Sequence, residues 1–206
     1  AMLDDYAMMI RAALALHEAT GDDTFLEQAK RWVAVADAHY WDGSNGGYFF
    51  TADDAETLIV RSKTAIDGAT PNGNGTMAAN LARLHYLTGD DLYRERAEAI
   101  VKAFAGEVAT RGIGMATLLN ANETLQHGLQ LVVVGDAEAA EPLLRAVYAQ
   151  SLPDRVLQIV ADTGALPSGH QAKGRQDERR GEAAIPTAFV CRAPTCTLPI
   201  TDAKGA

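Results

Sequence analysis

An internal repeat constrains the fold of this chain more than any other feature. The segment Leu16–Asp23 (LHEATGDD) recurs as Leu84–Asp91 (LHYLTGDD), which is an offset of 68 residues (84 − 16). The match continues at the same offset, pairing Phe25 with Tyr93, Glu27 with Glu95, Ala29 with Ala97 and Val33 with Val101. A fixed period with matching turn residues is typical of repeat architectures built from one supersecondary unit.

Each repeat unit predicts a hairpin of two helices. Residues 3–19 carry apolar side chains at helical spacing, and Gly21 ends this helix because glycine adopts the left-handed conformation without strain. Asp22 or Asp23 is expected to cap a second helix that has its own apolar stripe. The short turn makes the two helices antiparallel neighbours. The same reasoning predicts further helices at 76–87, 92–108 and 115–127.

The segments outside the hairpins have a different pattern. Residues 41–51 predict a turn and a short strand, with which 58–61 is expected to pair. Beyond residue 128, the pattern predicts a strand at 129–134, a helix at 138–150 and a strand at 156–160, followed by irregular chain up to 188–191. The expected fold is therefore mainly α, with helical hairpins in residues 1–127 and a small α/β segment in residues 128–206.

The hairpins are too few to bury their own apolar faces, because repeat units rely on neighbours for this. The sequence also opens with Ala1-Met2 inside an apparent helix. We therefore expect either a fragment of a longer protein, whose missing N-terminal part is a partner, or a homo-oligomer that covers the exposed faces.

Composition limits the classes of partner. The formal net charge of −9 and the sequence pI near 5.0 argue against nucleic acid, which needs a clustered basic face. No stretch approaches the roughly 20 apolar residues of a membrane span, and no signal peptide is expected, because the opening residues are acidic and lack a basic n-region. Two cysteines fit a cytoplasmic protein better than a disulfide scaffold.

Five short motifs occur in this order along the chain: LDDYA at 3–7, GGYFFT at 46–51, DGATPNGN at 67–74, VVGD at 133–136 and CRAPTC at 191–196. Together they resemble those of a known family, the thioredoxin-domain-containing (spermatogenesis-associated thioredoxin-like) proteins. The resemblance implies an N-terminal thioredoxin-like domain, absent from this sequence, followed by an (α/α)6 toroid similar to that of N-acylglucosamine 2-epimerases. On this basis, the chain is expected to be the C-terminal part of such a protein and to supply a partial toroid.

The toroid resemblance implies a carbohydrate-processing or carbohydrate-binding function, with sugar epimerases or glycosidases as the enzyme classes and no cofactor. A ligand would lie where loops meet the inner helix ends. Asp67 and Asp5 are the candidate catalytic residues, because two carboxylates with different pKa values can divide acid and base roles. The candidate substrate contacts are polar or aromatic: Asp4, Asn72, Asn74, Tyr6, Trp41, Tyr48 and Phe50. The alternative is that the polar residues cap helices and shape turns.

Two other interpretations remain open. The spacing of Cys191 and Cys196 favours buried structural thiols, with a redox-active pair as the alternative. No metal site is predicted, because a zinc site would need two further ligands. The second function hypothesis is a non-catalytic scaffold attached to a thioredoxin-like redox domain. A large exposed apolar patch would indicate this function, whereas a polar-lined cavity would indicate a carbohydrate site.

Overall fold

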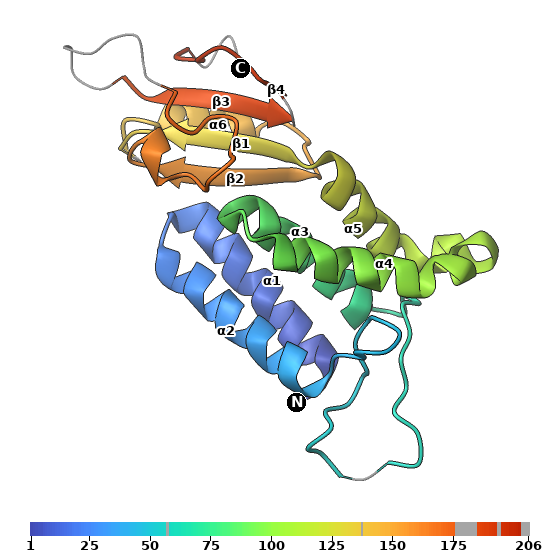
Figure 1. The fold of residues 1–206 in the computed structure, drawn as a ribbon. Coiled ribbons are helices and arrows are strands. Elements are labelled where there is room, and N and C mark those ends of the chain that lie inside the picture. Colours follow the sequence, from blue (N-terminus) through green and yellow to red (C-terminus); the bar gives the residue numbers. More distant parts are fainter. Residues whose placement is uncertain (57, 137, 176–184, 193–194, 203–206) are drawn as a thin grey trace. The chain divides into compact units, whose positions relative to one another are not determined.

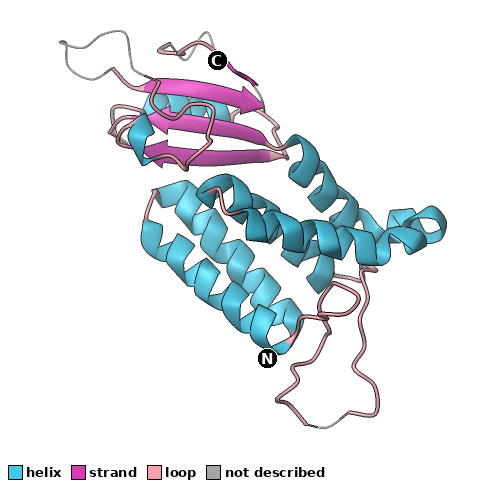
Figure 2. Cartoon of the chain, viewed as in Figure 1, coloured by secondary structure: helices cyan, strands magenta, loops and turns pink. Residues whose placement is uncertain are grey.

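The computed structural model describes residues 1–56, 58–136, 138–175, 185–192 and 195–202. The chain divides into two compact units: Ala1–His85 with Asp90–Gln126, and Tyr86–Gly89 with His127–Ala206. The first unit consists of helices and loops, and the second holds the sheet (Figure 2). The prediction of a mainly α chain followed by a small α/β segment is confirmed.

Two helical hairpins and a fifth helix form the first part of the fold. In the first hairpin, α1 (Leu3–Thr20) lies beside α2 (Asp23–His39) (Figure 1). In the second, α3 (Gly73–Thr88) is followed by α4 (Asp91–Arg111). A 3-10 turn, η1 (Gly112–Met115), then leads into α5 (Ala116–His127). Helices α1 and α3 each open a repeat unit, and we call α1, α3 and α5 the inner helices.

The sequence repeat is also a structural repeat. The turns between the helices contain Gly21 at φ 69° and Gly89 at φ 70°, in the left-handed region that favours glycine. Asp22 accepts a hydrogen bond from the Thr24 N–H, as Asp90 does from the Leu92 N–H, so both are N-caps. The preceding histidines also match, since Nδ1 of His17 and of His85 each lies 3.2 Å from the carbonyl oxygen of the capping aspartate.

The inner helices pack in a row. Asn80 of α3 donates from Nδ2 to the Ala7 carbonyl of α1 at 2.8 Å. On its other side, α3 approaches α5 so closely at Gly75 that an added Cβ would lie 2.9 Å from the Leu118 nitrogen. Glycine at this position therefore allows the close contact. The row contains these three inner helices, and its closure into a toroid stays a prediction.

The second unit is a β–α–β element with added antiparallel strands. Its elements are β1 (Leu129–Val134), α6 (Glu141–Tyr148), β2 (Arg155–Val160), the 3-10 turn η2 (Thr163–Ala165), β3 (Thr187–Arg192) and β4 (Thr195–Cys196). The strand order is β2-β1-β3-β4, with β1 and β2 parallel as predicted and β3 antiparallel to β1 (Figure 1). Leu143 and Val147 of α6 join a core cluster with Leu131 and Leu157 of the sheet.

The predicted strand at 58–61 is wrong. Within the described residues of the loop between α2 and α3, the structure has one isolated bridge, between Trp41 and Tyr48, and no strand. The Arg61 guanidinium donates to the carbonyl oxygens of Thr51 and His39, so Arg61 reaches residue 51 through its side chain and not through a strand ladder. None of the described helices is both long and apolar enough to cross a membrane.

Candidate functional site

Asp67 joins the loop before α3 to the beginning of α5. One carboxylate oxygen accepts the Asn72 N–H and the other accepts the Thr117 N–H, each at 2.9 Å. The Asp67 N–H in turn donates to the Gly114 carbonyl at 2.7 Å. These bonds place Asp67 at the N-terminal ends of α3 and α5, and they favour the capping interpretation. A catalytic role for Asp67 stays a prediction.

The two candidate asparagines also organise this loop. Asn72 caps α3, because its side-chain oxygen accepts the Asn74 N–H at 2.8 Å. Asn74 is buried, and its side chain accepts the Tyr48 N–H at 2.7 Å while donating to the carbonyls of Tyr48 and Thr64 at 2.9 Å each. Asn74 therefore fixes the loop against α3, and a direct contact with substrate would require these bonds to break.

The neighbouring carboxylates Asp4 and Asp5 have different environments. Asp5 is exposed and accepts the Met2 N–H at 2.8 Å, so it closes the first turn of its own helix. Asp4 is half-buried and accepts a hydrogen bond from the Gly73 N–H at the beginning of α3. Burial raises the pKa of Asp4 and the charge of Asp5 adds to this effect, although the bond from Gly73 opposes it. Asp4 is thus placed between two inner helix ends.

Three of the four candidate stacking residues contact another aromatic ring. Tyr48 is fully buried, and its ring lies edge-on to Trp41 at 4.9 Å between centroids. Its hydroxyl donates to Asp37 at 2.5 Å, and burial raises the Tyr48 pKa. Tyr6 makes an edge contact with Tyr40 at 5.6 Å.

Trp41 and Phe50 differ in how far their rings are covered. The Arg96 guanidinium lies 4.2 Å above the Trp41 ring. Phe50, at 38% exposure, is the most accessible of the four predicted stacking residues. Stacking of a sugar ring stays a prediction for all four.

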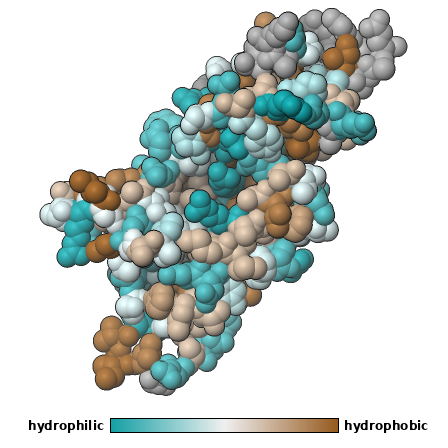
Figure 3. Space-filling view, turned by 180° about the vertical axis from the view of Figure 1, so that it is seen from behind, coloured by the Kyte–Doolittle hydropathy of each residue, from teal (hydrophilic) through white to brown (hydrophobic). Residues whose placement is uncertain are grey.

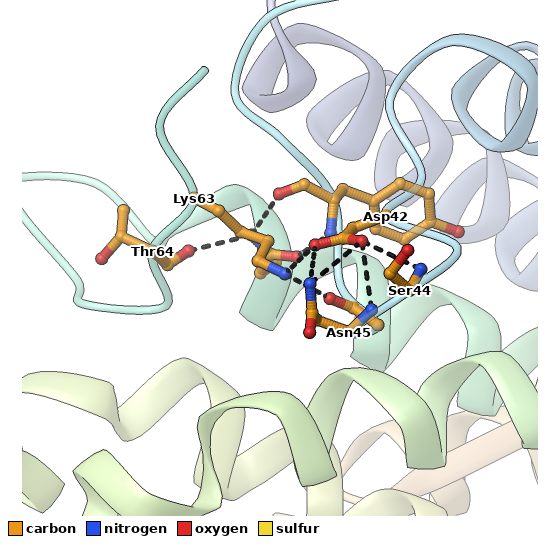
Figure 4. A network of polar contacts seen from close by, with 8 residues as sticks. Asp42, Ser44, Asn45, Lys63 and Thr64 are labelled. Carbon is orange, nitrogen blue, oxygen red and sulfur yellow. Dashed lines mark hydrogen bonds and ion pairs between the residues drawn. The ribbon is translucent and has the colours of Figure 1, made fainter. Parts of the chain in front are cut away.

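A charged network beside these residues was missed by the sequence reasoning (Figure 4). The Lys63 ammonium lies 2.6 Å from a carboxylate oxygen of Asp42 and donates to the Gly46 carbonyl at 2.7 Å. Asp42 also accepts the N–H groups of Ser44 and Asn45. The bond from Lys63 holds the pKa of Asp42 well below its usual range, despite the opposing effect of burial. The turn residues after Asp42 give a weak sequence signal, but nothing in the sequence singles out Lys63.

The half-buried His39 and the exposed Asp53 and Asp54 form a group that could bind a cation. The ligand atoms of His39, Asp53 and Asp54 lie within 4.8 Å of one another. His39 Nδ1 is 2.9 Å from Asp53, and this hydrogen bond raises the His39 pKa. The mutual attraction of the histidine and the two carboxylates accounts for the group without a metal ion.

Cys191 and Cys196 are joined by a disulfide, which corrects the expectation of free buried thiols. The two residues lie directly opposite each other in the antiparallel pairing of β3 with β4, so the hairpin register brings them together. Cys191 is buried as expected. A redox role for the pair stays a prediction.

No model of a protein family matches the chain. The chain is similar to Spermatogenesis-associated protein 20. The identity is 32% with the Homo sapiens protein, 31% with that of Rattus norvegicus and 30% with that of Mus musculus, each over 204 residues and 97% of this chain.

The chain spans about a quarter of the length of these relatives, since each match covers 26% of them. The similarity agrees with the spermatogenesis-associated part of the resemblance found from the motifs. The thioredoxin-like domain and the closed toroid rest on that resemblance alone.

Proposed function

We propose that the N-terminal ends of α1 and α3 form part of a carbohydrate-binding site in which Asp4 is the central polar contact. The observation that carries the proposal is the position of Asp4, a half-buried carboxylate at the junction of two inner helices. Helix N-termini offer backbone N–H donors, and a carboxylate offers acceptors, which together suit the hydroxyl groups of a sugar.

Polar residues also continue along α1 away from this location. Asp4, Arg11 and Glu18 are spaced by seven residues, which places them on one face of the helix. Glu18 lies about 21 Å along the helix from Asp4. It pairs with Arg83 of α3 at 3.4 Å, so this ion pair belongs to the contact between α1 and α3 and not to the proposed site.

The raised pKa of Asp4 also suits proton transfer, because a carboxyl that holds its proton more tightly can act as a general acid. If the full protein is an enzyme, we propose epimerisation or hydrolysis of a sugar as the reaction class, with Asp4 in this role. Asp5 is exposed and closes its own helix turn, and both carboxylate oxygens of Asp67 accept backbone N–H groups. Asp4 is half-buried and accepts one such bond, from Gly73, so we take Asp4 as our first choice.

The test is a thermal-shift screen of the full-length protein against a panel of sugars and sugar phosphates. A ligand that binds only the folded state at 100 times its Kd stabilises the protein by about 2.7 kcal/mol. We expect a sugar to raise the melting temperature of the wild type but not of Asp4→Asn. The control Asp23→Asn makes the same charge change in the first turn of α2 and should keep the increase. The absence of a shift with every sugar would reject the proposal.

An exposed apolar segment favours a protein-contact function as the second candidate. Leu58, Ile59 and Val60 are all exposed in the loop between α2 and α3, where Figure 3 shows a brown protrusion. Apolar residues that project in this way often mark protein contacts. A photo-crosslinker at Ile59 should then join one defined protein, whereas the same adducts from a crosslinker at the exposed polar Arg31 would show non-specific capture.

A further inference from the structure

The outermost strand of the sheet is short and little buried. β4 contains two residues, and the chain continues beside β3 after it. We call residues 195–202 the edge segment. Six of its eight residues are exposed, and only Cys196 and Ile200 are half-buried. Burial of apolar side chains therefore contributes little to holding this segment on the sheet.

Backbone hydrogen bonds join the edge segment to β3 at two places. Ala188 and Ile200 exchange both of their N–H···O bonds, at 2.8 and 2.9 Å. The Thr197 N–H donates to the Val190 carbonyl at 2.9 Å. The Arg175 guanidinium also donates to the Thr197 carbonyl, at 2.8 Å. Bonds of this kind at an exposed sheet edge open easily, because water replaces the lost partner.

The disulfide adds a covalent link between β3 and the edge segment. Cys191 and Cys196 lie directly opposite each other in the strand register, and their sulfurs are bonded. A cross-link that closes a short loop removes conformational freedom that the segment would gain on detaching. Because the other contacts are few and lie at an exposed edge, this bond decides whether the edge segment stays on β3.

The rest of the sheet has its own support. β3 pairs with β1 over five residues, from Thr187 to Cys191. Ala188 belongs to the core cluster shared with α6, and Phe189 belongs to the cluster on the opposite face. Cys191 is fully buried in that second cluster, where a free cysteine behaves as a small apolar residue. We therefore expect β3 to keep its place when the disulfide is reduced.

We propose that the Cys191–Cys196 disulfide is a redox-controlled latch, which a dithiol reductant opens to release the edge segment and expose the outer edge of β3. The two cysteines differ in access, since Cys196 is half-buried and Cys191 is fully buried. The exposed edge would carry the backbone groups of Ala188 and Val190 that the edge segment now pairs. This inference does not depend on the carbohydrate site.

The opening reaction is a thiol–disulfide exchange in two steps. A thiolate of the reductant attacks the Cys196 sulfur, the S–S bond breaks, and Cys191 leaves as a thiolate that takes up a proton. The second thiolate of the reductant then attacks the reductant's own sulfur in the mixed disulfide, and Cys196 is released and protonated. The dithiol thereby becomes a disulfide and loses two electrons, which reduce the two cysteines.

Hydrogen exchange measured at single amides tests the proposal on the full-length polypeptide that contains this sequence. The disulfide-bonded protein is compared with the same protein in dithiothreitol, which is the dithiol probe. We expect the amides of Ala188, Thr197 and Ile200 to exchange at least ~10-fold faster after reduction. The Gly135 amide, which bonds to Val160 where β1 and β2 end, should keep its rate.

Three results would overturn the proposal. Unchanged exchange at all three amides would show that the edge segment stays on β3 without the disulfide. Equally accelerated exchange at Gly135 would make the bond a staple of the whole sheet. Free thiols at both cysteines in the protein purified without reductant, detected by peptide mass spectrometry, would show that the latch does not form.

Cys196→Ser is the matched control, because it removes the latch and leaves Cys191 in the core. The variant should show the fast exchange at Thr197 and Ile200 without any reductant, and dithiothreitol should not increase it further. An effect of dithiothreitol that is as large in Cys196→Ser as in the wild type would come from other cysteines of the full-length protein and would overturn the proposal. If Cys196→Ser does not fold, the comparison of oxidised and reduced wild type decides.

Discussion

At the scale of single residues, the strongest electrostatic contact in the loop between α2 and α3 is the ion pair of Asp42 with Lys63. Both side chains are largely buried, and two backbone N–H groups complete the bonds of the carboxylate. Removing the charge of Asp42 leaves the largely buried Lys63 ammonium without its ion-pair partner, although it still donates to the Gly46 carbonyl. The pair therefore holds a loop that also carries the predicted aromatic residues.

We expect Asp42→Asn to lower the free energy of unfolding by about 3 kcal/mol, near the lower end for a broken buried pair. The lowered pKa of Asp42 means that the stabilising effect is complete above its ordinary value of 3.8 and is lost as the pH falls through the folded-state value. Urea unfolding at several pH values measures both effects. Asp54→Asn, at an exposed carboxylate, is the matched control, and an equal loss in both variants would contradict this account.

The pKa values of two histidines are expected to shift in opposite directions from the ordinary value of 6.5. The bond to Asp53 raises the pKa of His39, whereas burial lowers the pKa of His170. His39 therefore stabilises the fold below pH 6.5 and loses this effect as the pH rises, while His170 destabilises it as the pH falls below 6.5. An NMR titration should show both shifts, with His39 returning toward 6.5 in Asp53→Asn. Shifts in the same direction would contradict the assignment.

At the scale of helices and strands, the repeated turn chemistry sets where the hairpins begin and end. Asp22 and Asp90 occupy the same N-cap position, one in each unit. We expect Asp22→Ala and Asp90→Ala each to lower the free energy of unfolding by about 1 kcal/mol. Asp23→Ala should have a smaller effect, because Asp22 and not Asp23 makes the capping bond. Equal losses at 22 and 23 would show that the cap lies elsewhere.

The elements that follow from local pattern were predictable, and those that depend on distant partners were not. The hairpin helices and β1 were found because apolar spacing and turn residues are local signals. The strand expected at 58–61 is absent, and the apolar side chains Leu58, Ile59 and Val60 stay exposed with no surface to pack on, which the local sequence does not reveal. The expectation of free thiols at Cys191 and Cys196 failed for the same reason. Their disulfide depends on the pairing of β3 with β4.

The candidate site shows the same division. The sequence placed Asp4, Asp67 and Asn72 at inner helix ends, which is where they lie. The sequence could not show which of these side chains is most available to a ligand, because this depends on which of their oxygens already accept backbone N–H groups. Lys63, which is distant in sequence from Asp42, gave no signal at all.

At the scale of the whole molecule, α1, α3 and α5 form a row of inner helices with polar side chains at their N-terminal ends. Asp4 and Asp67 lie at successive junctions of that row, the first between α1 and α3 and the second between α3 and α5.

The central claim is that Asp4 contacts a sugar, and the most direct test is the Kd of the best ligand for the full-length protein and for its Asp4→Asn variant, measured by calorimetry. We predict binding at least ~10-fold weaker in the variant, which corresponds to a loss of about 1.4 kcal/mol, with the melting temperature of the unliganded protein retained. An unchanged Kd in Asp4→Asn would contradict the claim. If Asp5→Asn or Asp67→Asn weakened binding instead, the site would be organised around the carboxylates that the sequence had favoured.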